Sequence, residues 1–197
     1  MNVASDAEPP QFVIDALRAD DVDAIDQAVA LLVDAFPDWL PTIEMARDEV
    51  MEALGTDRIC LVARADDQIL GWIGGIPEYS QAWELHPLVV SADARHMGIG
   101  ASLVRALEER VREAGALTLY LGTDDDRPNP GTSAGGIDLF PDVLSHAVSL
   151  RVINHPAGFY LRMGFEIVGL IPDANGPGKP DILIAKRVSG GTVQSLA

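Results

Sequence analysis

The sequence predicts one mixed α/β domain that is not a regular doubly wound sheet. The first observation is size and composition, because 197 residues that are 48% hydrophobic suit a single core. The second is a run of three strand patterns between residues 58 and 90 with no helix pattern between them. The third is an amphipathic helix pattern over residues 98–114, which lies between two strand patterns. A doubly wound sheet would instead alternate strands and helices along its whole length.

The beginning of the chain is expected to hold one strand and two helices. Residues 12–17 alternate apolar and polar types, which is typical of a strand. Asp20 or Asp21 can cap a helix that ends before Pro37, and a second helix is expected over residues 41–54.

A three-stranded meander is expected next. Residues 58–64 and 69–76 form a predicted hairpin around an Ala-Asp-Asp-Gln turn, and residues 82–90 form its third strand. Pro87 lies inside that strand and has no N–H to donate, so we expect a bulge or a local break in pairing there.

The helix over residues 98–114 is the clearest element of the sequence. Apolar residues recur every four positions from Ile99 to Val111, and Gly115 ends the pattern. The remaining expected elements are the strand 117–122, the long loop 123–137, the helices 138–150 and 156–163, and the strands 165–171 and 181–186. Residues 1–10 and 189–197 resemble flexible tails around a single domain over residues 11–188.

Charge and composition exclude several classes of function. The net charge is −16, with 30 acidic and 14 basic residues, which argues against binding to nucleic acid or an anionic membrane surface. The acidity either keeps the protein soluble or attracts a cationic substrate. No apolar run approaches the ~18 residues of a membrane helix, and the acidic N-terminus is unlike a signal peptide. The single cysteine, Cys60, is expected in the core, which fits a reducing, cytoplasmic location.

The turn over residues 95–100 has the features of an anion site. It leads from a strand into a helix, whose first N–H groups have no intrahelical partners and carry the positive end of the helix dipole. Gly98 and Gly100 allow close approach of phosphate oxygens, and Arg95 adds a positive charge. The Gly-Lys-Ser/Thr ending of a Walker loop is absent, and Leu103 stands where a dinucleotide-binding motif needs glycine.

Two motifs together resemble the GNAT N-acetyltransferases. Arg95-x-x-Gly98-x-Gly100-Ala101 is followed, after a helix and a strand, by Asn154-x-x-Ala157-x-Phe159-Tyr160-x-x-x-Gly164-Phe165. The resemblance implies a sheet whose fourth and fifth strands part around acetyl-CoA. The cofactor residues that it implies are Leu88, Val89, Val90, Arg95, His96, Met97, Gly98, Ile99, Gly100, Ala101, Asn154 and Tyr160.

A narrower resemblance over residues 70–187 is to the aminoglycoside 6'-N-acetyltransferases. It is carried by segments 71–74, 83–90, 120–125, 155–156 and 173–181, and by the long insertion after Asp124. It implies a polycationic acceptor for the acidic protein, a homodimer, and an aromatic wall that contains Phe36. The substrate residues that it implies are Phe36, Tyr79, Glu84, Asp124, Asp125 and Asp138.

Three residues are the candidates for catalysis of amine attack on a thioester. In a strand Glu84, His86 and Leu88 share one face, so Glu84 or His86 can take the amine proton, directly or through water. Tyr160 is the candidate acid for the leaving thiolate, and the amide of Val89 or Val90 can stabilise the oxyanion. The four histidines show no metal-ligand spacing, so no metal is expected.

Other functions remain open from the sequence. One is a GNAT enzyme for a polyamine, a small metabolite or a protein amine. Another, of a different class, is a regulatory module that binds acyl-CoA without turnover.

Overall fold

The computed structural model describes residues 11–190 and arranges them in two compact units. The first unit contains the described residues up to Pro77 together with Leu85–Val111, and the second contains Glu78–Glu84 together with residues 112–190. The single domain over residues 11–188 stays a prediction. The tails expected over residues 1–10 and 189–197 lie outside the described residues, except for Ser189 and Gly190, which follow the last strand.

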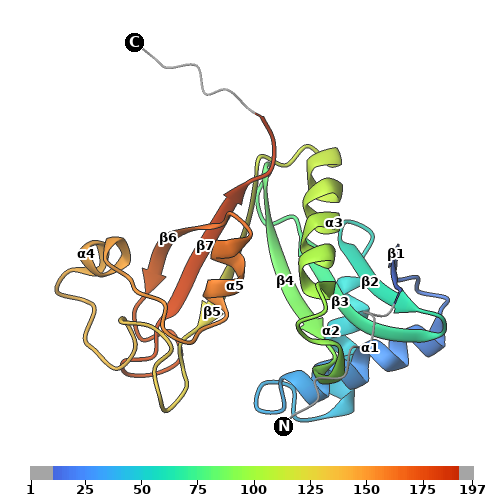
Figure 1. Ribbon diagram of the computed structural model, residues 1–197, viewed down its shortest axis with the longest axis horizontal. Coiled ribbons are helices and arrows are strands. Elements are labelled where there is room, and N and C mark those ends of the chain that lie inside the picture. The colour runs from blue at the N-terminus through green and yellow to red at the C-terminus, as the bar shows by residue number, and fades with distance from the viewer. Residues whose placement is uncertain (1–10, 191–197) are drawn as a thin grey trace, which may run out of the picture. The chain divides into compact units, whose positions relative to one another are not determined.

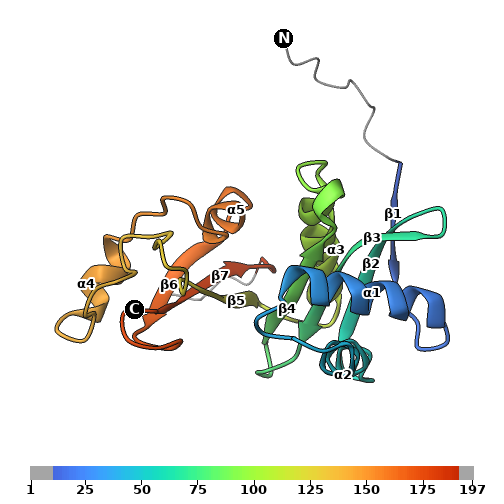
Figure 2. The ribbon, with the colours of Figure 1, turned by 90° about the horizontal axis from the view of Figure 1, so that it is seen from below.

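The first unit is a meander of antiparallel strands between two layers of helix. Figure 2 shows α1 and α2 on one side of the strands and α3 on the other. β1 pairs antiparallel with β2, and β2 pairs antiparallel with β3. The elements are β1 (Val13–Ala16), α1 (Val22–Ala35), α2 (Ile43–Ala53), β2 (Ile59–Ala65), β3 (Gln68–Ile76), the later part of β4 (Ala82–Val90), the 3-10 turn η1 (Ala92–Ala94) and α3 (Ile99–Glu113).

Helix capping and core burial explain why these elements form where they do. The Asp21 carboxylate caps α1 by accepting from the N–H of Ala24, which resolves the alternative caps in favour of Asp21. Trp72 on β3 is fully buried against α1, and its indole Nε1 donates to the carbonyl oxygen of Ala28 at 3.2 Å. Cys60 lies in this core as expected, and burial raises the pKa of its thiol to about 12.

Two glycines on β3 let that strand lie close to β4. A Cβ at Gly71 would be 2.5 Å from the carbonyl oxygen of Val89, and a Cβ at Gly74 would overlap the carbonyl oxygen of His86. Neither position therefore accepts a side chain without backbone movement. Glycine at positions 71 and 74 therefore permits the close approach of β3 to the part of β4 that carries His86 and Val89.

The second unit is built around the antiparallel strands β5, β7 and β6 (Figure 1). Its elements are the first residues of β4, β5 (Thr118–Asp124), α4 (Val143–Val148), α5 (Ala157–Arg162), β6 (Glu166–Ile171) and β7 (Asp181–Arg187). β5 pairs with β7 along its whole length, from Thr118–Arg187 to Asp124–Asp181. The strand order of the complete sheet is β1-β2-β3-β4-β5-β7-β6, so the predicted mixed α/β fold is confirmed.

The parallel ladder between β4 and β5 is short. It consists of three pairs, Ala82–Thr118, Trp83–Leu119 and Glu84–Tyr120. β4 itself runs through Pro87 as one strand, with a cis peptide bond between His86 and Pro87. The bulge or local break in pairing expected at Pro87 stays a prediction.

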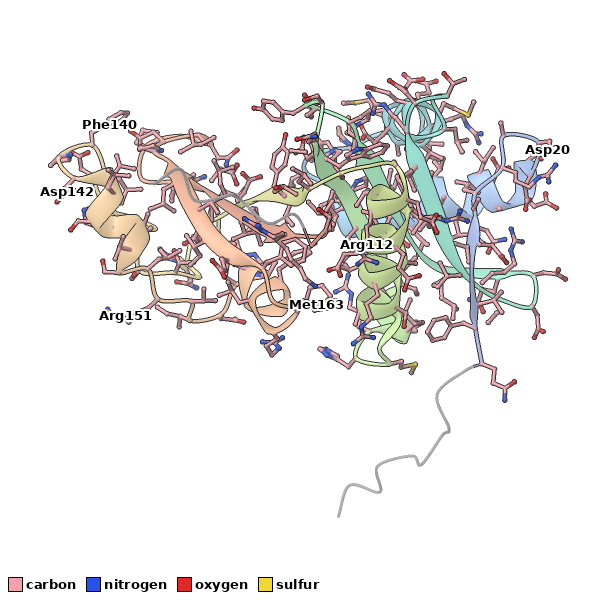
Figure 3. The ribbon with its side chains drawn as sticks, turned by 90° about the horizontal axis from the view of Figure 1, so that it is seen from above. Asp20, Arg112, Phe140, Asp142, Arg151 and Met163 are labelled. Atoms are coloured by element: carbon pink, nitrogen blue, oxygen red, sulfur yellow. The ribbon has the colours of Figure 1, made fainter. Side chains whose placement is uncertain are left out.

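The helix predicted over residues 138–150 is wrong at its start. The structure has only α4 (Val143–Val148), whose first turn is capped by the Asp142 carboxylate, and Figure 3 shows Asp142 at that helix end. Pro141 disfavours a helical conformation at Phe140. Asp138 instead forms a local turn, because its Oδ1 accepts from the N–H of Phe140 at 3.1 Å. Among residues 11–190, no helix has both the length and the apolar character to cross a bilayer.

Candidate functional site

The second half of β4 presents one buried and one partly exposed face. Leu85, Pro87 and Val89 are buried, whereas the residues between them are partly exposed. His86 and Leu88 therefore share the accessible face, as the alternation of a strand predicts. This face leads directly into the turn expected to hold the cofactor.

The turn after β4 gives the first unit a set of backbone N–H groups at a helix N-terminus. Gly98 has φ +83° and His96 has φ +65°, so both lie in the left-handed region. The Ser102 N–H donates to the Gly98 carbonyl at 3.0 Å, so the N–H groups before Ser102 precede the helix's own hydrogen-bond ladder. Arg95 is exposed, and its Nε donates to the Val90 carbonyl at 3.3 Å. These groups fit a pyrophosphate, because N–H donors, a helix dipole and a guanidinium all favour an anion.

His86 is held by two neighbours that the sequence did not indicate. Its Nε2 lies 3.3 Å from Oε1 of Glu49 on α2, and the Trp39 ring packs edge-on against the imidazole at 5.3 Å between centroids. Phe36 contacts Trp39 in turn, with 5.7 Å between ring centroids. The hydrogen bond from His86 lowers the pKa of Glu49 despite its partial burial. The expected aromatic wall at Phe36 thus continues through Trp39 to His86.

In the second unit, two tyrosines lie among carboxylates. Glu84 and Tyr120 are partners in the β4–β5 ladder, and the Tyr79 ring is 6.1 Å from the Tyr120 ring. Burial, then the negative charges of Glu84 and Glu78, raise the pKa of Tyr120 to about 12. Tyr79 is 67% exposed. The group therefore offers negative charge and aromatic surface, both of which attract an ammonium group.

Asp124 is exposed at the end of β5 and is held from two sides. Its Oδ1 accepts from Nδ2 of Asn175 at 2.5 Å, and Nε2 of His155 lies 2.8 Å from its backbone carbonyl oxygen. Asp181 is its ladder partner, and burial together with the charge of Asp124 raises the pKa of Asp181. Asn175 and His155 were not among the predicted site residues, although the segments that contain them carry the family resemblance.

Asp125 forms hydrogen bonds within the loop after β5, and its predicted substrate contact stays a prediction. Its side chain is buried, with a relative exposure of 2%. Its carboxylate accepts from the N–H groups of Gly131 and Thr132 and from the Thr132 hydroxyl, at 2.7 to 3.0 Å. These bonds close the loop that follows β5. Asp138 is exposed, but the local turn at Phe140 engages one of its carboxylate oxygens.

Tyr160 and Asn154 lie in the second unit. Tyr160 is buried on α5 between the rings of Phe159 and Phe165, at 4.9 and 5.6 Å between centroids. Burial raises the pKa of its phenol, so Tyr160 is protonated at neutral pH. Asn154 is exposed, and its N–H donates to the Gly131 carbonyl. In the part of the chain that is described, no group of three or more His, Cys, Asp or Glu residues is arranged to hold a metal.

Comparisons with known proteins identify one family and one fold. The sequence matches the acetyltransferase (GNAT) family model over residues 25–130. It is similar to a solved aminoglycoside 6'-N-acetyltransferase complexed with coenzyme A, at 36% identity and a TM-score of 0.86, over 92% of this chain and 99% of that one. A comparison with curated proteins found no match.

Two further solved structures are similar over most of their length. The aminoglycoside 6'-N-acetyltransferase from Enterococcus faecium is 36% identical, with a TM-score of 0.84 over 92% of this chain and 99% of that one. Aminoglycoside 6'-acetyltransferase type Ii is 34% identical, with a TM-score of 0.72 over 91% and 99% of the two chains.

The fold, the turn at Gly98 and these matches place the protein in one class, the acetyl-transferring enzymes. The chain belongs to the GNAT acetyltransferase family. The resemblance seen in the sequence is thereby confirmed at the level of family, fold and reaction class. The roles of individual residues, and the homodimer, stay predictions.

Proposed function

We propose that this protein transfers the acetyl group of acetyl-CoA to the 6'-amine of an aminoglycoside. The observation that carries the proposal is the similarity to a 6'-N-acetyltransferase over 92% of this chain, at 36% identity. The match also covers 99% of that enzyme's chain, so the likeness extends over nearly its whole length.

The charges of the second unit support a polycationic acceptor. Glu78 and Glu84 lie close enough to Tyr120 to raise its pKa, so their negative charge is felt at that phenol. Asp124 adds an exposed carboxylate at the end of β5. Aminoglycosides carry several ammonium groups, and the net charge of −16 attracts such molecules over a distance limited by the ionic strength.

The first unit supports an anionic donor in an otherwise acidic protein. The N–H groups between Arg95 and Ala101 and the Arg95 side chain would hold the pyrophosphate of CoA. The backbone of Leu88, Val89 and Val90 would pair with the pantetheine amides. Asn154 and Tyr160, which belong to the second unit, are proposed from the family resemblance for the far end of the cofactor.

The residues of this chain would supply proton transfer to the reaction. The amine enters as an ammonium ion, and His86 or Glu84 takes a proton from it so that the nitrogen lone pair is free. The acetyl thioester supplies the acyl carbon, at which a C–N bond forms while the C–S bond breaks and its electron pair leaves on sulfur. The amide N–H of Val89 or Val90 donates a hydrogen bond to the oxyanion. Tyr160 gives its proton to the leaving sulfur. The phenolate then takes the second proton from the nitrogen of the former amine.

A rate assay with matched acceptors tests the proposal. Thiol release from acetyl-CoA is measured with two aminoglycosides that differ only in an amine or a hydroxyl at position 6', with a polyamine, and with a basic peptide. We expect turnover with the 6'-amine alone to exceed the other three. Equal rates with the 6'-hydroxyl compound, or faster rates with the polyamine or the peptide, would assign the enzyme to another acceptor.

A further inference from the structure

The surroundings of His86 identify Glu49 as a residue with a function that neither the sequence nor the family resemblance assigned. Glu49 lies on α2, 37 positions before His86 on β4, and both belong to the first unit. Its Oε1 is 3.3 Å from Nε2 of His86, at the long end of N–H···O distances. The Glu49 side chain is 19% exposed and that of His86 is 36% exposed, so water screens the pair only in part.

A carboxylate at this place decides which ring nitrogen carries the proton. A neutral imidazole has one N–H and one bare nitrogen, and a carboxylate accepts hydrogen bonds but cannot donate one when ionised. The lowered pKa of Glu49 keeps this carboxylate ionised at neutral pH. The proton of a neutral His86 therefore belongs on Nε2, beside Glu49, and the lone pair belongs on Nδ1.

The packing around the imidazole also restricts rotation of the ring. The Trp39 indole meets the imidazole at 72° and 5.3 Å between centroids, on a side chain that Phe36 supports. The close approach of Gly74 to the His86 carbonyl sets the position of the backbone of β4 at this residue. The carboxylate thus fixes the proton, while the aromatic contact packs against the ring.

We propose that Glu49 is a positioning residue that holds His86 in the Nε2–H tautomer, so that Nδ1 is the nitrogen that takes the proton of the acceptor amine. This inference rests on the proposed function, and it chooses His86 over Glu84 as the base. A carboxylate that orients a histidine base is a recurring arrangement in enzymes. The proton leaves the ammonium nitrogen, binds to Nδ1, and passes to solvent after the acetyl group has been transferred.

The test observes the tautomer directly in the full-length protein without any acceptor. The ring nitrogens of 15N-histidine-labelled protein are recorded by NMR at about pH 8, where an ordinary imidazole is neutral. A His86→Gln variant assigns the His86 signals. We expect wild-type His86 to carry its proton on Nε2. Glu49→Gln keeps the shape of the side chain but offers a hydrogen-bond donor as well as an acceptor. It should shift the tautomer ratio of His86 about tenfold towards Nδ1–H, because charge-assisted hydrogen bonds are about twice as strong as neutral ones.

A matched control and a kinetic readout complete the experiment. Asp48→Asn removes a negative charge from the neighbouring, exposed position of α2 and should leave the tautomer and kcat unchanged. Glu49→Gln should lower kcat by the same factor by which the Nε2–H fraction of His86 falls in the NMR spectra, and leave KM for acetyl-CoA unchanged. Circular dichroism establishes that each variant is folded.

The outcomes separate this inference from the proposed function. An Nδ1–H tautomer in the wild type, or the same ratio in Glu49→Gln as in the wild type, overturns the inference even if aminoglycosides are acetylated. An equal shift in Asp48→Asn also overturns it, because general charge would then be the cause. A tautomer fixed by Glu49 without turnover of aminoglycosides contradicts only the proposed function.

Discussion

Replacing Gly98 by alanine tests whether the turn before α3 holds the donor pyrophosphate. Gly98 has φ +83°, and a Cβ built there meets no atom of the described protein within 4 Å. The substitution therefore adds no steric overlap, and its whole effect comes from the backbone conformation. An L-residue in the left-handed region costs about 1–2 kcal/mol.

That cost can be relieved in the free protein only if the turn moves. Residues 95–98 are exposed, so the turn can relax towards negative φ, which redirects the N–H groups that precede Ser102. Binding of CoA must then restore the original conformation. Affinity for CoA should fall by the same 1–2 kcal/mol, which is about 5- to 30-fold in Kd.

Gly115 provides a matched control at the other end of the same helix. It has φ +88°, and a Cβ there also meets nothing within 4 Å. Gly115→Ala should lower the free energy of unfolding by about 1–2 kcal/mol and leave CoA affinity unchanged. Isothermal titration with CoA and urea unfolding measure the two quantities for both variants. Wild-type affinity in Gly98→Ala, or an equal loss of affinity in Gly115→Ala, would refute a pyrophosphate site at this turn.

Three further predictions concern the second unit. Tyr160→Phe should lower kcat by up to about a hundredfold, while the Kd of CoA measured by titration stays unchanged. An unchanged kcat would contradict the proposed role of Tyr160 as the acid. Asn175→Ala removes the hydrogen bond that holds the Asp124 carboxylate, and it should raise KM for the aminoglycoside about 3- to 10-fold with KM for acetyl-CoA unchanged. Asn129→Ala, at an exposed position, serves as the control. An equal effect in the control contradicts the reasoning. Because the pKa of Asp181 is raised in the folded protein, its ionisation opposes folding as pH rises above the ordinary value of about 3.9. Asp181→Asn should therefore unfold at a higher urea midpoint than the wild type at neutral pH and at the same midpoint near pH 3; a lower midpoint at neutral pH contradicts this.

The sequence was sufficient for features that depend on local patterns. The period of α3, a helix cap at Asp20 or Asp21 and the hairpin around Asp66–Asp67 all depend on residues close together in the chain. The two motifs that predicted the family are local in the same way. The alternation along β4 predicted that His86 and Leu88 share a face, and burial confirms it. The helix starting at 138 was predicted wrongly because the pattern of apolar residues outweighed Pro141, whose effect on Phe140 prevents that start.

Contacts between distant segments could not be predicted in this way. Glu49 on α2 and His86 on β4 meet although 37 positions separate them, and neither residue has a neighbour in sequence that indicates the other. Asp124 and Asp125 are adjacent and chemically identical, yet one is exposed and the other buried under the loop that it holds together. That difference depends on where the chain returns at Gly131 and Thr132, which composition and spacing do not specify.

The position of the acetyl group in the product tests the central claim most directly. The purified protein is incubated with acetyl-CoA and an aminoglycoside that has amines on several rings, and the product is examined by two-dimensional NMR. We predict a single acetyl group on the 6' nitrogen. Acetylation at another nitrogen, or an unmodified antibiotic while a polyamine or a peptide is acetylated, would contradict the proposed function.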